Sequence, residues 1–261
     1  MTRALTTSSR VRPRVRTLTC TLCALVLPML ALSDVDADEP VGNDQAKSQW
    51  ARQLSRLDAL VTEQPDQLTL YSQRGDVLFY LGRFEAAVAD YDKMIELDAN
   101  RAASHWRRGI ALFYAGRAKE AAAQFEQYHS FDDVDRENGI WRYFSQWKAS
   151  GKDAAQAELL RYEKDDREPF PDLYAFFAGK LTSEEVLSHI EEAELPAHER
   201  RKREFYAHLY LGLERALAED SKAARSLLTR AVENDWPRQA GYGPHYMWQV
   251  GRLHLEQLAN E

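Results

Sequence analysis

Histidine, cysteine and carboxylate side chains are the groups of this sequence best suited to chemistry. Their spacing does not form a recognisable catalytic or metal-binding motif. The histidines are scattered along the chain: His105, His129, His189, His198, His208, His245 and His254. There is no HExxH motif, and the two cysteines, Cys20 and Cys23, lie close to the N-terminus. A zinc site needs several such ligands at one point. The sequence therefore predicts no metal site and no cofactor.

Motifs for nucleophilic or phosphate chemistry are also missing. The chain has no GxSxG motif, no phosphate-cradling glycine loop and no dinucleotide fingerprint. The acidic pairs Glu184-Glu185 and Glu191-Glu192 are adjacent in sequence. Adjacent side chains point to different sides of a helix, which favours solvated faces over acid/base pairs. We therefore expect that the protein is not an enzyme.

The charge distribution argues against binding to nucleic acid or to an anionic membrane. The 261 residues contain 34 Lys and Arg against 41 Asp and Glu, a formal net charge of −7. Removing residues 1–37 takes away five arginines and two aspartates and leaves a net charge of −10. A chain this acidic is poorly suited to binding nucleic acid or an anionic membrane surface. The basic run Arg200–Arg203 could dock an acidic partner, but Glu199 and Glu204 flank it, which favours an exposed helix face.

The N-terminal segment resembles an export signal. Arginines precede an apolar run of 15 residues, Leu18–Leu32, whereas a membrane span needs about 20. This pattern predicts a cleaved signal peptide over residues 1–37, with cleavage after Ser33 or Ala37, or else retention as an anchor. No cysteine follows the run, so lipidation is not expected. After cleavage we expect a periplasmic protein without a stable membrane span, beginning with a linker over residues 38–46.

An internal repeat predicts the fold. Residues 71–100 and 105–134 align at an offset of 34. The matched pairs are Gly75 and Gly109, Phe79 and Phe113, Tyr80 and Tyr114, Gly82 and Gly116, Ala87 and Ala121, and Tyr91 and Phe125. Self-similarity at this period is typical of stacked helical hairpins. We expect Gly75 to meet Ala87 where the two helices of a hairpin cross, Gly82 to end the first helix in a left-handed conformation, and Tyr91 to fill the groove toward the next hairpin.

This pattern resembles the tetratricopeptide repeat, although Ala99 and Asp133 stand where that repeat usually closes with proline. The resemblance implies an all-α, right-handed superhelix. Its expected parts are a half repeat over 47–66, repeats over 68–101 and 102–135, a degenerate helical region over 136–204, a repeat over 205–238 and a capping helix over 244–259, together forming a solenoid over 47–261. No alternating strand pattern is present.

Residues 65–235 further resemble the NlpI-type envelope proteins. The resemblance rests on the segments Arg108–Tyr114, Phe177–Leu181 and Tyr210–Gly212, and on the Trp141 helix. It implies a tetratricopeptide adaptor under the outer membrane that presents murein hydrolases to a tail-specific protease. Members of that group are usually lipidated and dimeric, whereas this sequence has no lipobox.

The repeat register predicts a concave groove lined by the first helix of each hairpin. We expect a protein or peptide partner there, bound by Asp76, Tyr80, Trp106, Arg107, Ile110 and Tyr114. Tyrosine and tryptophan are frequent interface anchors because they bury a large area at low entropic cost. The same aromatic side chains could instead pack between hairpins, and both interpretations stay open for Tyr80, Trp106 and Tyr114.

The sequence as a whole predicts an exported, non-enzymatic adaptor of the cell envelope. Two alternatives remain open. One is an envelope hydrolase or processing factor with its site in residues 136–204. The other is a structural homodimer that uses the aromatic N-terminal half as its interface.

Overall fold

The computed structural model describes residues 43–259, so the expected signal peptide over 1–37 lies outside the described residues. The described helices are α1 (Asn43–Glu63), α2 (Leu68–Tyr80), α3 (Phe84–Leu97), the short 3-10 helix η1 (Ala99–Arg101), α4 (Trp106–Tyr114), α5 (Ala118–Phe131), α6 (Arg136–Ser150), α7 (Lys152–Ala157), α8 (Phe170–Phe177), α9 (Ser183–Glu192), α10 (Ala197–Leu217), α11 (Ser221–Glu233), α12 (Trp236–Gln239) and α13 (Tyr242–Ala259). No strand occurs between residues 43 and 259, which confirms the all-α prediction. Within that range, no helix combines the length and apolarity that crossing a membrane requires.

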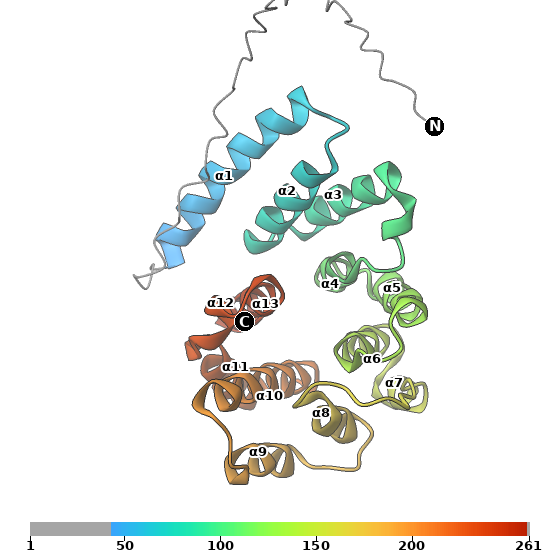
Figure 1. Cartoon of the computed structure of the whole chain (residues 1–261), viewed down its shortest axis with the longest axis vertical. Helices are drawn as coiled ribbons and strands as arrows, with labels where there is room; N and C mark the ends of the chain where they lie inside the picture. Colours follow the sequence, from blue (N-terminus) through green and yellow to red (C-terminus); the bar gives the residue numbers. More distant parts are fainter. Residues whose placement is uncertain (1–42, 260–261) are drawn as a thin grey trace, which may run out of the picture. The chain divides into compact units, whose positions relative to one another are not determined.

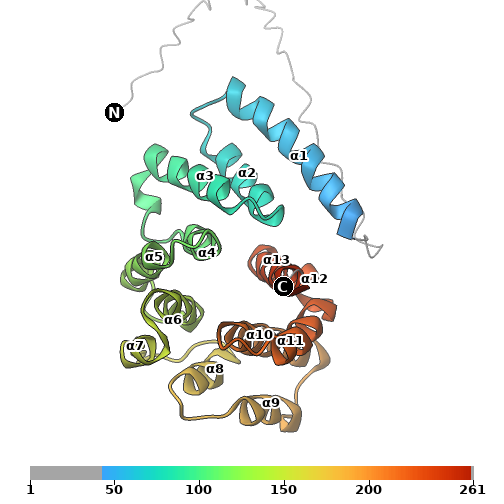
Figure 2. The ribbon, with the colours of Figure 1, turned by 180° about the vertical axis from the view of Figure 1, so that it is seen from behind.

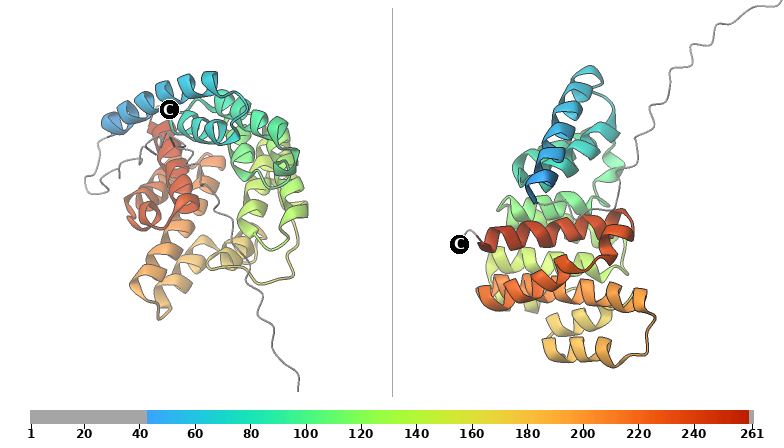
Figure 3. Two further views of the ribbon diagram at one scale, coloured as in Figure 1. Left: turned by 45° about the horizontal axis from the view of Figure 1, so that its top comes forward. Right: turned by 90° about the vertical axis from the view of Figure 1, so that its left-hand side faces the viewer.

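Residues 43–259 form one compact unit of helices that pack on their neighbours in chain order. α2 packs on α3, α4 on α5, α5 on α6, and α10 on α11, as expected for a helical repeat solenoid (Figure 1). The last helix departs from this order. α13 packs on α11 and α12 and also contacts α10 and α2, so it lies on the inner side of the row of helices (Figure 2). Figure 3 shows the same placement of α13 from two further sides.

The turns between paired helices confirm the repeat register. Gly82 and Gly116 have φ angles of +73° and +78°, the left-handed conformation that a side chain disfavours. The equivalent position in the C-terminal hairpin is Glu219, seven residues after Gly212, and it also has a positive φ of +61°. A non-glycine residue there shows that the turn geometry survives where the sequence signal is lost.

The close contact inside each hairpin involves a different residue from the one expected. A Cβ atom added to Gly75 would lie 2.5 Å from the ring of Tyr91, and one added to Gly109 would lie 2.5 Å from the ring of Phe125. The nearest neighbour of Gly75 is therefore Tyr91, and the expected contact with Ala87 stays a prediction. The aromatic ring of the second helix reaches back over the glycine of its own hairpin, because only a residue without a side chain leaves space for it.

Several predicted boundaries also differ from the structure. α1 begins at Asn43, so the last four residues of the expected linker 38–46 are helical. α10 begins at Ala197, inside the region 136–204 that was expected to be degenerate, because its first turns are charged and carry no apolar period. The capping helix expected over 244–259 begins at Tyr242, directly after a turn at Gly241 with φ of +107°.

The glycine contact predicts a specific loss of stability. We expect Gly109→Ala to lower the free energy of unfolding by about 1–3 kcal/mol, because the added methyl group overlaps the fully buried Phe125 ring. Gly243→Ala is the matched control, since a Cβ there meets no atom within 4 Å. Alanine is the better helix former, so the control should be unchanged or stabilised by up to about 1 kcal/mol. Urea unfolding followed by circular dichroism tests the pair, and equal unfolding free energies would contradict the packing argument.

Candidate functional site

A buried carboxylate joins the first two repeats to the last helix. Asp76 on α2 accepts hydrogen bonds from the Tyr91 hydroxyl at 2.8 Å and from Arg107 Nη1 at 2.7 Å. Its second oxygen accepts a hydrogen bond from the hydroxyl of Tyr242, on α13, at 2.6 Å. The three donors come from α3, α4 and α13, so one side chain fixes the relative positions of four helices.

Arg107 lies between this carboxylate and two aromatic rings. Its guanidinium carbon is 5.3 Å from the ring centre of Tyr91 and 5.4 Å from that of Tyr242. Both Nη atoms also donate to the Ser72 hydroxyl at 3.1 Å. Burial lowers the pKa of Arg107, but Asp76 together with the tyrosines Tyr242 and Tyr91 more than offsets this and leaves the pKa above its usual value. The largely buried guanidinium is therefore held as a cation by one carboxylate and two tyrosine faces, of which that of Tyr242 belongs to a half-exposed side chain.

The remaining aromatic residues of the expected groove also contact α13. Tyr80 is buried, with its ring centre 5.6 Å from that of Tyr246, and its carbonyl oxygen accepts a hydrogen bond of 2.7 Å from Arg252. Trp106 packs edge-on against Tyr246 at 5.0 Å. The Tyr114 hydroxyl lies 3.2 Å from Nδ1 of His254.

All six predicted partner-binding residues therefore lie on the side of the repeats where α13 packs. Asp76, Tyr80, Trp106, Arg107 and Tyr114 contact this helix directly, and Ile110 lines a cavity together with Met247 of α13. The register identified the inner face, and the structure places the chain's own last helix against it. Whether a partner also binds these residues stays a prediction.

Beside α13 lies a cavity of about 420 Å³. It is lined by residues of α4, α5, α6, α10, α12 and α13, of the turn before α6 and of the segment before α8: Trp106, Ile110, Tyr128, Asp135, Glu137, Asn138, Trp141, Arg167, Lys202, Tyr206, Trp236, Gly243, Pro244 and Met247. Its volume is in the usual range for ligand sites, and its walls combine aromatic faces with a few charged groups. Of the six predicted residues, Trp106 and Ile110 belong to this cavity. The others that line it were missed because most lie outside the two clear repeats.

Charged groups at one wall of the cavity share a single guanidinium. Arg167 forms ion pairs with Asp135, with Asp166 and with Glu137. The other oxygen of Glu137 accepts a 2.5 Å hydrogen bond from the Tyr210 hydroxyl. Burial raises the pKa of Asp135 and raises that of Glu137 to about 7, although Arg167 acts in the opposite direction. One positive charge therefore faces three carboxylates, two of which line the cavity.

Three of the histidines are buried or half-buried, and a fourth is paired with a carboxylate. Burial lowers the pKa of His105 to about 3 and those of His208 and His254 to about 4, so they are neutral at pH 7. Exposed His189 pairs with Asp172 at 2.8 Å. Between residues 43 and 259, no three histidine, cysteine or acidic side chains are grouped so as to hold a metal ion.

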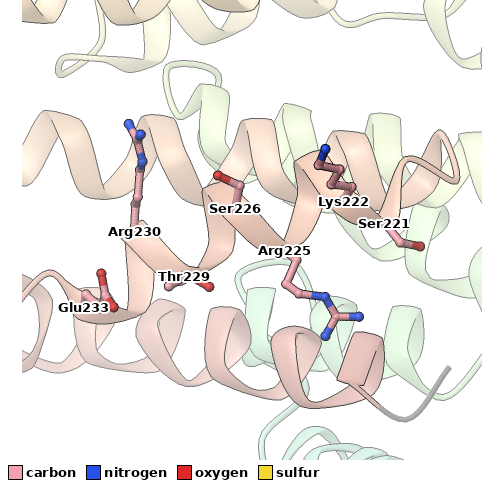
Figure 4. A pocket seen from close by; sticks show the side chains of 7 residues that line it. All are labelled: Ser221, Lys222, Arg225, Ser226, Thr229, Arg230 and Glu233. Carbon is pink, nitrogen blue, oxygen red and sulfur yellow. The ribbon is translucent and has the colours of Figure 1, made fainter.

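A second hollow, of about 720 Å³, lies on the outer face of α11 (Figure 4). Its lining residues are Ser221, Lys222, Arg225, Ser226, Thr229, Arg230 and Glu233. Apart from half-buried Thr229, these side chains are exposed. Arg225 donates to the carbonyl of Leu258 at 2.5 Å, which ties this face to the end of α13. The hollow is a polar helix surface, without the aromatic walls of the inner cavity.

Comparison with protein families identifies a repeat in the N-terminal half of the chain. The family model described as a TPR repeat matches residues 75–116, which cover the second half of α2 from Gly75 on, all of α3 and α4, and the turn that follows. Among solved structures, a tetratricopeptide repeat protein from Parabacteroides merdae is similar over 86% of this chain and 87% of its own, with 12% sequence identity and a TM-score of 0.45. The family match supports a TPR protein, and repeats of this kind form protein-interaction scaffolds.

The Asp76 contacts predict that replacing this buried carboxylate lowers the free energy of unfolding more than replacing an exposed one. We expect Asp76→Asn to lower the free energy of unfolding by about 2–4 kcal/mol, because it leaves the guanidinium of Arg107 buried without its counter-charge. Asp92→Asn is the control. Asp92 also pairs with an arginine, Arg108, but its side chain is 45% exposed, so the loss should stay below about 1 kcal/mol. Chemical unfolding measures both, and equal losses would show that burial of the pair does not matter.

The pKa of Glu137 predicts a pH-dependent stability. Its pKa is about 7 in the folded chain and about 4.5 when unfolded, so the folded state binds the proton more tightly. The contribution of this group is therefore complete below pH about 4.5 and is lost as the pH rises through about 7. Relative to Glu137→Gln, the wild type should lose on the order of 1–3 kcal/mol of unfolding free energy across that interval. Unfolding measured at several pH values tests this, and parallel curves for the two proteins would contradict it.

Proposed function

We propose that this protein is an exported, non-enzymatic adaptor of the cell envelope that binds a segment of a protein partner in the cavity beside α13. The observation that carries the proposal is the cavity's position on the inner side of a tetratricopeptide scaffold, the side such scaffolds use for partners. Three tryptophans line it, and tryptophan is among the residues that contribute most to protein interfaces.

The location of the site follows from what α13 covers. Tyr80, Arg107 and Tyr114 are engaged by the last helix and by their own neighbours, so a partner would have to displace α13 to reach them. Trp106 and Ile110 line both the inner face of the repeats and the cavity. Ile110 is buried, whereas Trp106 is partly exposed, so a partner can reach the inner face at Trp106 while α13 stays in place.

The proposed location and pathway rest on the sequence. The N-terminal arginines and the apolar run Leu18–Leu32 support export. The resemblance of residues 65–235 to NlpI-type adaptors supports a role in presenting cell-wall enzymes to a protease. The mature chain is acidic, which favours a basic binding segment on the partner over an acidic one.

A capture experiment with a blocked cavity tests the proposal. Gly243 lines the cavity, and a Cβ there meets no atom within 4 Å, so Gly243→Phe should fill the cavity without disturbing the core. We expect crosslinked capture from an envelope extract to recover a cell-wall hydrolase or a protease with the wild type, and at least tenfold less of it with this variant, since losing one interface anchor costs about 1.4 kcal/mol or more.

Ser226→Phe is the matched control, because it places the same side chain on the outer face of α11. It should capture the partner as the wild type does. If all three proteins capture the same set, or none captures a specific protein, the cavity is not the docking site. If Ser226→Phe alone loses the partner, the outer face of α11 is the interface instead.

One observation favours the hydrolase alternative as a second candidate. Glu137 lies in the region 136–204, lines the cavity and has a pKa of about 7, the value that suits a general acid or base at neutral pH. Turnover of a murein or peptide substrate by the purified protein, abolished by Glu137→Gln in a folded variant, would support this function and contradict the adaptor proposal.

The homodimer alternative stays a prediction. Of the aromatic residues in the N-terminal half, Tyr80, Trp106 and Tyr114 are in contact with α13, which leaves less of that surface for a self-interface. Light scattering at high protein concentration would detect a dimer formed through another surface.

A further inference from the structure

We propose that the cavity beside α13 is a cation site, which takes the side chain of a lysine or arginine from the partner's binding segment between its tryptophan walls and the carboxylates of Asp135 and Glu137. This inference rests on the proposed function for its partner and adds the chemistry that the partner must present.

The walls of the cavity have the composition of a cation-binding cage. Trp106 and Trp236, from α4 and α12, are partly exposed, and the buried residues Trp141, Tyr128 and Tyr206, from α6, α5 and α10, complete the lining. Aromatic faces attract a cation through the ring quadrupole, most strongly for tryptophan and for a cation removed from water. The Trp141 indole already donates to the Tyr210 hydroxyl at 3.1 Å, which holds its ring in one orientation.

The charges around the cavity favour a cation over an anion. The two basic groups that line it are already paired. Lys202 donates to both oxygens of Glu199 at 3.2 Å, and Arg167 is shared among three carboxylates. A partner carboxylate would have to compete for these cations. A partner ammonium or guanidinium would instead meet Asp135 and Glu137, for which one guanidinium is an incomplete counter-charge.

The raised pKa values of the two carboxylates agree with this charge balance. Burial raises the pKa of both Asp135 and Glu137 despite the nearby guanidinium of Arg167. A second cation at the cavity would stabilise their charged forms and offset part of the cost of burying them.

The same protein contains a filled example of this arrangement. The guanidinium of Arg107 lies against the rings of Tyr91 and Tyr242 and pairs with Asp76 at 2.7 Å. The ring centres of Trp106 and Tyr242 are 6.4 Å apart, and Trp106 also lines the cavity. The two arrangements therefore lie next to each other. In the first the chain supplies its own cation, whereas in the cavity the aromatic residues and carboxylates are present and the partner supplies the cation.

Small probes of one backbone and different side chains test the proposal on the full-length protein. The probes are the N-acetyl methylamides of lysine, arginine, norleucine and glutamate. The chain has six tryptophans, whose indole N–H signals can be followed by NMR, and Trp→Phe substitution assigns those of Trp106 and Trp236. We expect the lysine and arginine probes to shift these two signals and to bind on the order of tenfold more tightly than norleucine.

Two variants separate the charge effect from blocking of the cavity. Asp135→Asn with Glu137→Gln should reduce the preference for lysine over norleucine without abolishing norleucine binding. Gly243→Phe should abolish binding of all probes, with the other indole signals unchanged. Butylammonium serves as an amine without a peptide backbone. Because the proposed contacts are made by the side chain alone, butylammonium should shift the same two signals, and failure to do so would show that the probes bind through their backbone and contradict the cation site.

The proposal is overturned if norleucine binds as tightly as lysine or if glutamate binds more tightly. Its failure can be told apart from failure of the adaptor function. A partner whose capture depends on the open cavity, but whose binding segment tolerates replacement of every lysine and arginine, would leave the adaptor standing and remove the cation site. Cation binding without any captured partner would do the reverse.

Discussion

The buried pair of Asp76 and Arg107 is the contact on which the arrangement of the inner face depends. A buried carboxylate needs a counter-charge and further donors, and here they come from α3, α4 and α13. Because Tyr242 is one of these donors, α13 cannot leave the inner face without exposing or orphaning the pair. The ion pair therefore links the closing of the repeats to the position of a helix more than 130 residues further along the chain.

Because α13 covers the inner side of the first two repeats, it changes which part of that surface a partner can reach. The first helices of the two clear repeats bear large aromatic side chains on their inner side, and leaving that surface in water would be unfavourable. The rings of Tyr246 and Phe79 stack with centres 4.9 Å apart, and the guanidinium of Arg252 lies 4.7 Å from the ring centre of Trp50. These contacts use the surface that a free solenoid would present to a peptide. The accessible inner surface is consequently displaced toward the middle helices, where the cavity lies.

The sequence predicted the parts of this arrangement that depend on local period. The spacing of Gly75 and Gly109, with Gly82 and Gly116 seven residues after each, determines the hairpin register, and Asp76, which the register predicts for the inner face, pairs with Arg107 in the structure. It could not place α13, because the contact joins residues far apart in sequence and periodicity carries no information on such pairs. The interpretation of α13 as a simple cap followed from the same limit.

The cavity could not be predicted from the sequence, for a different physical reason. Its charged wall depends on Arg167, which lies in the irregular segment between α7 and α8, and on Asp135, the residue that caps α6 through the Glu137 amide. Neither position repeats, so no offset of 34 could point to them.

A degenerate segment in a repeat protein is free of the packing rules that constrain its neighbours. Here it gathers three carboxylates around one guanidinium beside aromatic walls. That charge balance would be unfavourable for a purely structural core, since the same volume filled with apolar side chains would avoid the cost of burying the charges. Its presence next to an open cavity is the reason to look for the function in this segment rather than in the regular repeats.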